Sequence, residues 1–398
     1  MIFLYFYVVP AMAKCDHLAW LELLEGKGGP LLSHGWRLSQ IFRDLPKPTE
    51  QTPQITLFLG RTLKDKALRA LCDSNFRHQR RQRGINIRAD NRTLHSLQPR
   101  LFADSDPTTL TLQPAYSSPR ICHRDEVIPI NQLPLDYSLY DLVFARLLFM
   151  FVEVICIFAE DVGGLDEVYR MLSLWTTIGT ASSLPCDIRP RVLIVVNGDN
   201  PSITHRVLEE NCFLSDLQAQ YSSLHKTFRD IRFSPLPSDE LSAEARFLSL
   251  SADISRQLHD ARFTRLRHQA MFCAAHMAEF FKLAARNLSN TSLGQFNFVA
   301  FSREENPLDG AFRSHLLNFL NIGAKTKIPY GGLASHIASA LLMDAYPPGM
   351  HGWYSHTHEK VLILTKEQTF VRGLFSEHYS TTPAMQPIAK PTAPKSSQ

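Results

Sequence analysis

The chain has 398 residues, of which 44% are hydrophobic and 20% charged, a composition typical of a soluble globular protein with room for two domains. Its formal net charge is only +4, so charge gives no reason to expect nucleic acid or an anionic membrane as the partner. The seven cysteines are scattered and include no CxxC pair, which excludes the usual zinc and disulfide frameworks and predicts reduced thiols in a cytoplasmic protein.

The N-terminus has the outline of a secretory signal, a short apolar run that ends in Ala11-Met12-Ala13. No Lys or Arg precedes the run, and nothing downstream is typical of a disulfide-stapled secreted domain. We therefore expect residues 1–13 to be a buried or untidy N-terminus, with Met12 as an alternative start. An N-terminal helical arm over residues 17–43 and a proline-containing linker complete the segment 1–53.

From residue 54 to residue 237, apolar runs of strand length alternate with longer helical patterns. Strands are expected at Ile55–Leu59, Gly84–Ala89, Arg100–Ala103, Val152–Ala159, Arg191–Val196 and Ile231–Ser234. After Gly163-Gly164, apolar residues recur at steps of three and four up to Ile178, which predicts a helix that covers the sheet. This alternation is typical of an α/β domain with a mainly parallel sheet.

The longest apolar stretch, residues 139–159, contains Arg146 and Glu153. A charge at the centre of a bilayer costs about 2.5–3.5 kcal/mol, so the stretch predicts a buried helix followed by a buried strand and not a transmembrane segment. Residues 238–346 show only helical periodicity and are expected to form a helical domain. A short helix and a disordered tail are expected over 347–398.

The most informative segment is Gln54-ITLFLGRTLKDKALRAL, in which a strand ends at Gly60 and a helix is expected to begin near Lys66. Gly60 and Lys66 have the spacing of a Walker A loop, but Asp65 replaces its second glycine and Ala67 its metal-binding hydroxyl. A carboxylate at ~4 Å from a phosphate oxygen would be repelled by about 4 kcal/mol at an effective dielectric constant of 20. Both a degenerate phosphate loop and an ordinary strand-to-helix turn remain open.

Later positions also resemble the motifs of a small GTPase and depart from them. The corresponding segments are Asp104-Ser-Asp106-Pro107, Asn197-Gly-Asp199-Asn200 and Phe233-Ser234-Pro235. Proline replaces the glycine of the first motif, Asn200 replaces the base-reading aspartate of the second, and Pro235 replaces the alanine of the third. The expected fold is thus a degenerate P-loop GTPase-like α/β domain followed by an all-helical region.

Four phrases of the sequence carry a resemblance to a known family. They are LFLGRTLKDKALRAL, LYDLVFARLLFMFVEVICIFAEDVGG, SSLPCDIRPRVLIVV and LLMDAYPPGMH. Together they resemble the region upstream of the catalytic domain in large fungal patatin-like phospholipase proteins, over about Ile55 to His351. The resemblance implies a role in lipid metabolism beside a patatin-type hydrolase domain.

The hydrolase motifs themselves are missing. The chain has no GxSxG, and the nearest segment, Gly179 to Ser183, lacks the closing glycine of a nucleophile elbow. Asp309-Gly310-Ala311 matches the family's aspartate motif by letters, but with no nucleophile to orient we interpret it as a turn. We expect the upstream region alone, with its hydrolase domain missing or encoded elsewhere.

Two polar clusters have alternative readings. The basic run Arg77 to Arg83 fits a solvated surface loop better than a phosphate-binding surface, because no aromatic residues alternate with the arginines for base stacking. His351, His356 and His358 lie close together without the spacing of a helical zinc site, which favours a histidine-rich loop.

The leading hypothesis is a non-catalytic regulatory or interaction module, with a patatin-type hydrolase domain or another protein as its partner. No cofactor, metal or catalytic residue is expected, and Gly60 and Lys66 are the only vestigial nucleotide-binding residues. One alternative is a weak NTPase that uses Lys66 for phosphates and Asp104 or Asp106 for a metal. Another is a lipid or nucleic-acid surface binder that uses the Arg77 to Arg83 run.

Overall fold

The computed structural model describes residues 18–34, 37–73, 84–114, 126–130, 137–198, 203–268, 270–290, 294–298, 301, 310–326, 333 and 337. The chain divides into two compact units, Met1–Phe298 and Val299–Gln398. The sheet belongs to the first unit. The described helix of the second unit is α12 (Phe312–Lys325). The predicted N-terminal segment 1–13, the basic run and the histidine cluster lie outside the described residues.

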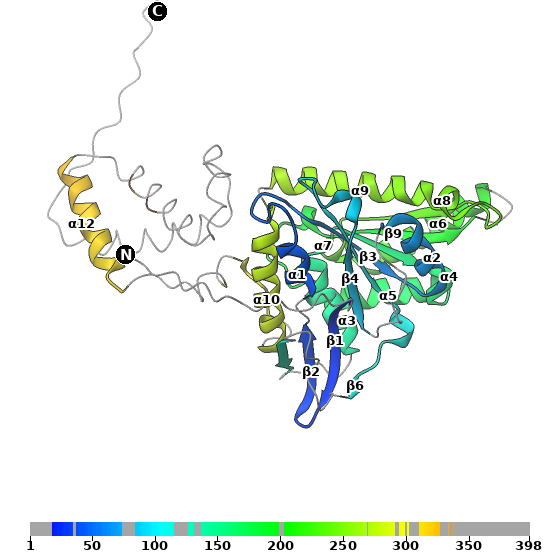
Figure 1. The fold of residues 1–398 in the computed structure, drawn as a ribbon, viewed down its shortest axis with the longest axis horizontal. Coiled ribbons are helices and arrows are strands. Elements are labelled where there is room, and N and C mark those ends of the chain that lie inside the picture. The colour runs from blue at the N-terminus through cyan, green and yellow to red at the C-terminus, as the bar shows by residue number, and fades with distance from the viewer. Residues whose placement is uncertain are drawn as a thin grey trace, which may run out of the picture. The chain divides into compact units, whose positions relative to one another are not determined.

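A ten-stranded sheet, formed by described residues, organises the first unit (Figure 1). Its strands are β1 (Ala19–Gly26), β2 (Gly29–His34), β3 (Gln54–Leu59), β4 (Ile85–Ala89), β5 (Arg100–Ser105), β6 (Gln113–Pro114), β7 (Glu126–Pro129), β8 (Val154–Phe158), β9 (Arg191–Asn197) and β10 (Asp230–Leu236). They lie in the order β10-β9-β8-β3-β5-β4-β1-β2-β7, and β6 pairs with β1. The five strands from β10 to β5 are parallel, whereas β4, β1, β2 and β7 each pair antiparallel with their neighbour.

Each of the six strands that the sequence predicts between residues 54 and 237 is present, with bounds that shift by a few residues at most. The central strands β3 and β8 are buried along their whole length, as expected for strands covered on both faces. The structure therefore confirms a mixed α/β fold with a large, mostly parallel central sheet.

The prediction of an N-terminal helical arm is wrong, because β1 and β2 form a hairpin there and, of the described residues of this segment, only those of α1 (Arg37–Arg43) are helical. Apolar residues of β1 fall in pairs, a pattern that also fits a helix. The hairpin closes at Gly29, whose φ of 126° is left-handed and favours glycine. Its Trp20 ring packs 4.9 Å from Phe281 of α10 (Ala274–Asn290), so a distant helix provides the surface on which the strands pack.

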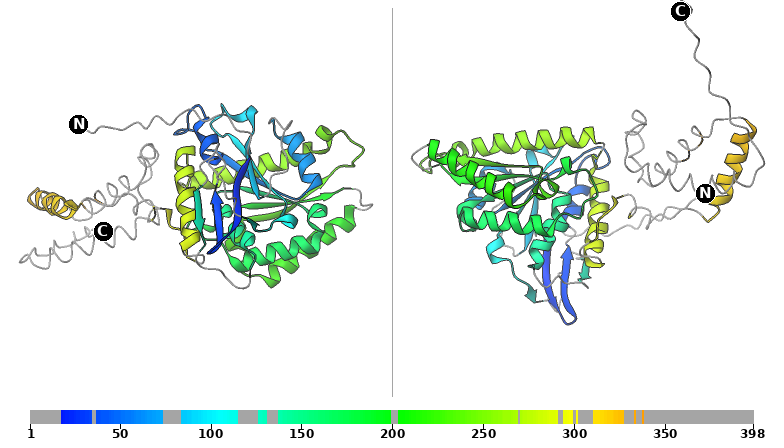
Figure 2. Two further views of the ribbon diagram at one scale, coloured as in Figure 1. Left: turned by 60° about the horizontal axis from the view of Figure 1, so that its bottom comes forward. Right: turned by 180° about the vertical axis from the view of Figure 1, so that it is seen from behind.

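Helices cover both faces of the central sheet (Figures 1 and 2). On one face lie α2 (Thr62–Leu71), α8 (Ala243–Arg246) and α9 (Leu248–Arg267). On the other face lie α3 (Leu139–Arg146), α5 (Leu165–Ile178), α6 (Ile203–Gln220) and α7 (Leu224–Thr227). Short elements η2 (Asn91–Thr93), η3 (Pro107–Thr109), η4 (Leu148–Met150), α4 (Ala159–Val162) and η5 (Cys186–Ile188) connect the longer ones.

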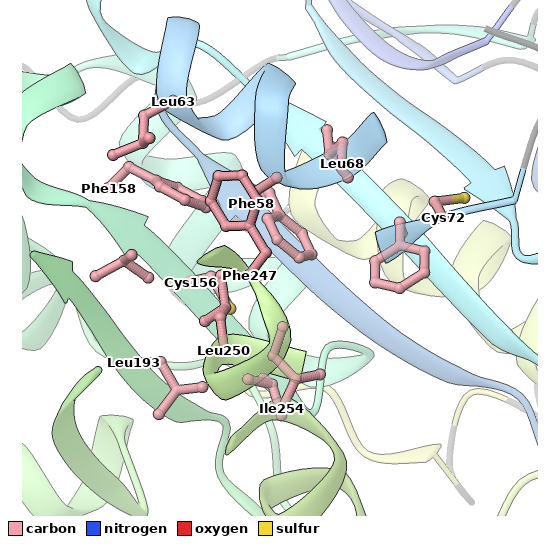
Figure 3. Close-up of a cluster of buried hydrophobic side chains, with 14 of the residues drawn as sticks. Phe58, Leu63, Leu68, Cys72, Cys156, Phe158, Leu193, Phe247, Leu250 and Ile254 are labelled. Carbon is pink, nitrogen blue, oxygen red and sulfur yellow. The ribbon is translucent and has the colours of Figure 1, made fainter. Parts of the chain in front are cut away.

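The core on the α2 and α9 face is a continuous hydrophobic cluster (Figure 3). Phe58 of β3 lies between Phe102 and Phe158 at ring-centroid distances of 5.5 and 5.9 Å. Leu63 of α2 and Phe247, Leu250 and Ile254, at and after the start of α9, complete the cluster. Burying a side chain of this size contributes roughly 1.5–3 kcal/mol, so the cluster fixes both helices on the sheet.

Helices α8 and α9 therefore pack in the same compact unit as the sheet. The sequence predicts a separate helical domain from residue 238, but this boundary falls inside the first unit, since the apolar face of α9 is buried by strand residues. No helix among the described residues is long and apolar enough to cross a membrane.

The predicted helix after Gly164 is α5, and its Trp175 is buried beside Phe144 and Phe149. The Trp175 Nε1–H donates to Asp141 Oδ1 at 2.8 Å. Burial is the main cause that raises the pKa of the Asp141 carboxyl above its ordinary value, and the hydrogen bond from Trp175 acts in the opposite direction. Asp141 thus binds a proton more tightly in the folded chain than in the unfolded one.

A raised folded-state pKa gives a contribution to stability that is complete at acid pH and is lost as the pH rises through the folded-state value. Asp141→Asn is expected to remove this loss while keeping an acceptor for Trp175. The unfolding free energy of Asp141→Asn minus that of wild type should therefore increase from acid to neutral pH, as measured by urea denaturation. A difference that does not change with pH would contradict the assignment.

Candidate functional site

The carboxyl ends of the parallel strands bring together residues that the sequence singles out and two acidic residues that it does not, Glu160 and Asp161. Gly60 follows β3, Asp106 follows β5, Glu160 and Asp161 follow β8, and Asn197 ends β9. In open α/β sheets this edge is the usual place for a ligand. The polar groups found there, however, mostly form hydrogen bonds and ion pairs with one another.

Gly60 lies where the chain turns from β3 into α2. Its N–H donates to the Ser105 carbonyl at 3.1 Å, which holds the turn against β5. A Cβ at this position would lie 2.8 Å from Asp161 Oδ2 and 3.0 Å from the Phe158 Cβ. Glycine is therefore required here so that the Asp161 side chain can approach the backbone closely.

Helix α2 begins at Thr62, so the predicted helix start near Lys66 is wrong. Only Gly60 and Arg61 separate β3 from α2, and four residues expected in a phosphate loop are helical instead. Lys66 is exposed on α2, whereas Ala67 is buried in the core beneath it. Whether Gly60 and Lys66 descend from a phosphate loop stays a prediction.

The carboxylate of Asp161 caps the first turn of α2. Its Oδ2 accepts the backbone N–H of Arg61 and Lys64, both at 2.8 Å, and its Oδ1 accepts those of Thr62 and Leu63, both at 3.1 Å. These are the unpaired donors at a helix N-terminus, where the helix dipole also favours negative charge. Such a set of N–H groups binds phosphate in many nucleotide-binding proteins.

A second cluster lies between α2 and the β4–β5 pair. Asp104 Oδ2 is 3.1 Å from Lys64 Nζ, and Asp104 Oδ1 is 2.5 Å from Arg88 Nη2. All three side chains are nearly inaccessible, with exposed fractions of 6%, 6% and 7% for Lys64, Asp104 and Arg88. Lys64 also approaches Asp65 Oδ1 at 3.2 Å. The buried lysine of this segment is therefore Lys64, and its charge is balanced by carboxylates.

Asp106, the other aspartate of the segment that resembles a GTPase motif, has a local role. Its side chain accepts the N–H of Thr108 at 3.1 Å and caps η3, with Pro107 at the first helical position. Arg61 Nε lies 3.9 Å from its carboxylate, a loose contact between two partly exposed groups. Pro107 thus fits the helical turn at the place where the motif would have glycine.

Arg246 engages Asn197 at the end of β9. The Arg246 Nη2 donates to Asn197 Oδ1 at 2.8 Å, and the Asn197 backbone N–H donates to Glu160 Oε1 at 2.7 Å. Asp199 and Asn200 lie outside the described residues. The segment Phe233-Ser234-Pro235 lies inside β10 and not in a turn, and Ser234 Oγ donates to Asp253 Oδ2 at 2.7 Å.

The Gly179 to Ser183 segment has a structural role, because it follows α5 and its buried Ser182 forms an isolated bridge to Phe296. Asp309 lies outside the described residues. Within the described part of the chain, His, Cys, Asp and Glu side chains form no group of three or more that could hold a metal ion.

The cysteines at described positions are free thiols. Cys156 is fully buried in β8, and burial is the main cause that raises its thiol pKa far above the ordinary value. It behaves as the small hydrophobic residue that the sequence predicts.

Sequence reasoning missed Asp161, Lys64, Arg88 and Arg246, the residues that fill the site. The phrase FAEDVGG carried one signal, because two acidic residues directly follow a fully apolar strand and must lie at its carboxyl end. The pairing of Asp161 with α2 spans about a hundred residues and could not be inferred from local pattern.

No family model matches the sequence, and a search of curated proteins gives no match. Among solved structures, the chain is similar to a siderophore hydrolase, EstA, from Aspergillus nidulans, at 11% sequence identity and a TM-score of 0.24. The match covers 63% of this chain and 98% of that one. Similarity at this level carries no argument about activity, and the resemblance to patatin-like phospholipase proteins stays a prediction. The fold and site define a mixed α/β protein whose carboxyl edge is closed by its own side chains.

Proposed function

We propose that the chain is a non-catalytic, GTPase-like regulatory or interaction module whose nucleotide site is filled by its own side chains. The observation that carries the proposal is the Asp161 carboxylate, which accepts the four N–H groups from Arg61 to Lys64. A nucleotide phosphate would need the same donors. It would also meet the negative charge of Asp161, at a cost of about 4 kcal/mol for two charges 4 Å apart at an effective dielectric constant of 20.

The strand order supports the GTPase-like part of the proposal. When β6 and β7 are left out, the order β4-β5-β3-β8-β9-β10 corresponds to the second, third, first, fourth, fifth and sixth strands counted from β3, and of these six only β4 runs antiparallel to the rest. A small GTPase has the same order, with its second strand antiparallel. Here the hairpin β1–β2 extends the sheet beyond β4.

The residues at the place where a GTPase binds the guanine base support the claim that the nucleotide site is filled. Asn197 occupies the place of the motif's asparagine, but its Oδ1 is used by Arg246. Arg246 is itself buried, with 7% of its surface exposed, and it belongs to α8, which contacts α2. A bound base would have to displace this contact.

The proposed partner, a patatin-type hydrolase domain or another protein, rests on the sequence phrases given above. A regulatory module of this kind would bind its partner through the surface of its fold and would not need to catalyse a reaction. The competing hypothesis is a weak NTPase, for which Lys66 would contact phosphate and Asp104 or Asp106 a metal. Against it, Asp104 is already paired with two cations.

Thermal denaturation with GTP or ATP plus Mg²⁺ tests the proposal, because a ligand that binds only the folded state raises Tm by mass action. We expect no rise in Tm for the wild-type chain with millimolar nucleotide. The matched pair Lys66→Ala and Arg69→Ala removes one exposed cation of α2 in each case. A rise in Tm that Lys66→Ala abolishes and Arg69→Ala retains would overturn the non-binding claim.

Steady-state release of phosphate separates the NTPase hypothesis from simple binding. We expect the purified chain to release no more phosphate from GTP or ATP than the Lys66→Ala variant does. Turnover above this control would establish an NTPase and remove the proposed non-catalytic role.

A further inference from the structure

A cleft of about 310 Å³ opens at the amino end of β10, at the opposite edge of the sheet from the candidate site. The end of α6, helix α7 and the first residues of β10 form its walls. The volume is at the lower end of the range that holds small organic ligands.

Apolar and polar side chains contribute about equally to the lining. Leu214, Leu224, Phe228 and Ile231 provide the apolar surface. Gln218, Tyr221, Ser222 and His225 provide hydrogen-bonding groups, and Arg229 provides a guanidinium. Such a lining can hold a ligand by its apolar body and orient it by its polar head.

The charged side chains at the cleft form ion pairs. Arg229 Nη1 lies 2.8 Å from Asp187 Oδ1, and Asp187 Oδ2 also lies 3.2 Å from His268 Nε2, so one carboxylate faces two basic groups. The acidic residue of the lining, Asp230, is paired with Arg232 through a 2.5 Å contact. Each of these two carboxylates is paired with an arginine, which reduces its repulsion of a bound anion.

Two buried arginines behind the cleft add positive charge. Arg189 donates to the carbonyls of Lys226 and Ser182, and Arg191 donates to the Thr264 hydroxyl. Neither guanidinium forms an ion pair with a described residue. Burial is the main cause that lowers the pKa of both. For Arg191 the charges of Asp260 and Asp230 act in the opposite direction, and those of Arg229 and Arg232 act in the same direction. Both guanidiniums would help to stabilise an anion bound at Arg229.

We propose that this cleft binds a small organic anion with an apolar body, such as an aryl or short acyl carboxylate or phosphate monoester. The anionic head lies at Arg229, and the body lies against Phe228 and the leucines. Arg229 suits this role because its guanidinium can bind a carboxylate or phosphate while Nη1 stays on Asp187. The proposal is independent of the nucleotide question, since the carboxyl edge contributes no residue to the cleft.

Ligand-observed NMR with the full chain tests the proposal with four probes: 3-phenylpropionate, phenyl phosphate, 3-phenylpropanol and inorganic phosphate. We expect at least one of the two aryl anions to bind, with the neutral alcohol and inorganic phosphate weaker by about tenfold or more. The better of the two anions identifies the head group as carboxylate or phosphate. Equal binding of the alcohol, or no binding of either aryl anion at millimolar concentration, would overturn the proposal.

The matched variants are Arg229→Gln, which removes the cation of the cleft, and Arg256→Gln, which removes an exposed cation of α9 outside the lining. Arg229→Gln is expected to weaken the anion by about tenfold or more, and Arg256→Gln by less than about threefold. Ser222→Trp, at an exposed lining position, should block binding without altering the core. Equal effects of the two arginine variants, or unchanged binding in Ser222→Trp, would show that the anion binds elsewhere.

Discussion

Replacing Asp104 by alanine is expected to lower the free energy of unfolding by about 3–5 kcal/mol, because it leaves two buried cations without their shared carboxylate. Lys64 Nζ and Arg88 Nη2 lie 3.1 and 2.5 Å from the two Asp104 oxygens, and none of the three side chains exposes more than 7% of its surface. Asp65 reaches Lys64 at 3.2 Å but is one-third exposed, so it compensates only in part. The loss is a large share of the stability of an ordinary domain, and chemical denaturation measures it.

The control for Asp104→Ala is Glu50→Ala, which breaks the exposed Lys47–Glu50 pair at 2.9 Å. That change should cost less than about 1 kcal/mol, since a solvated pair gains little. The double variant Lys64→Met/Asp104→Asn removes the Lys64 ammonium together with the negative charge of Asp104. It should therefore recover much of the free energy of unfolding that Asp104→Ala loses. If Asp104→Ala cost no more than Glu50→Ala, the cluster would not be a buried ionic network.

Asp161→Ala is expected to lower the unfolding free energy by about 2–3 kcal/mol, because it removes a charged cap from the start of α2. The four N–H groups from Arg61 to Lys64 would lose their acceptor. Water can reach the exposed N–H groups of Arg61 and Thr62, so the cost stays below that of a fully buried charge. Asp161→Asn keeps one oxygen acceptor, so its free energy of unfolding should fall by roughly half as much as that of Asp161→Ala.

A second measurement asks whether Asp161 occupies an anion site. Millimolar inorganic phosphate should raise the Tm of Asp161→Ala more than that of wild type, at ionic strength matched with NaCl. Glu50→Ala is the control, since it removes an exposed carboxylate paired with Lys47 and leaves the start of α2 intact. An equal response of all three proteins to phosphate would mean that Asp161 is only a helix cap, and the main support for the proposed function would fall.

The candidate site could be predicted only in part. The sequence points to Gly60, Asp104, Asp106 and Asn197 through the spacing of a Walker A loop and the order of GTPase-like motifs. The expected helix start near Lys66 is wrong, because it assumes a loop up to residue 65, whereas α2 begins at Thr62 and Lys66 is exposed on it. The spacing of letters could not show where the helix would start, since Asp161 stabilises that start from a distant part of the chain.

The sequence by itself determined the central strands and the helix after Gly164, because runs of buried apolar residues and three-and-four spacing are local properties. It did not determine β1 and β2, whose apolar pattern fits a helix until the packing of Trp20 on α10 is known. Nor did it determine that α9 belongs with the sheet, or that Asp161, Asp104 and Arg246 fill the carboxyl edge. These contacts join residues far apart in the chain, so only the tertiary structure decided them.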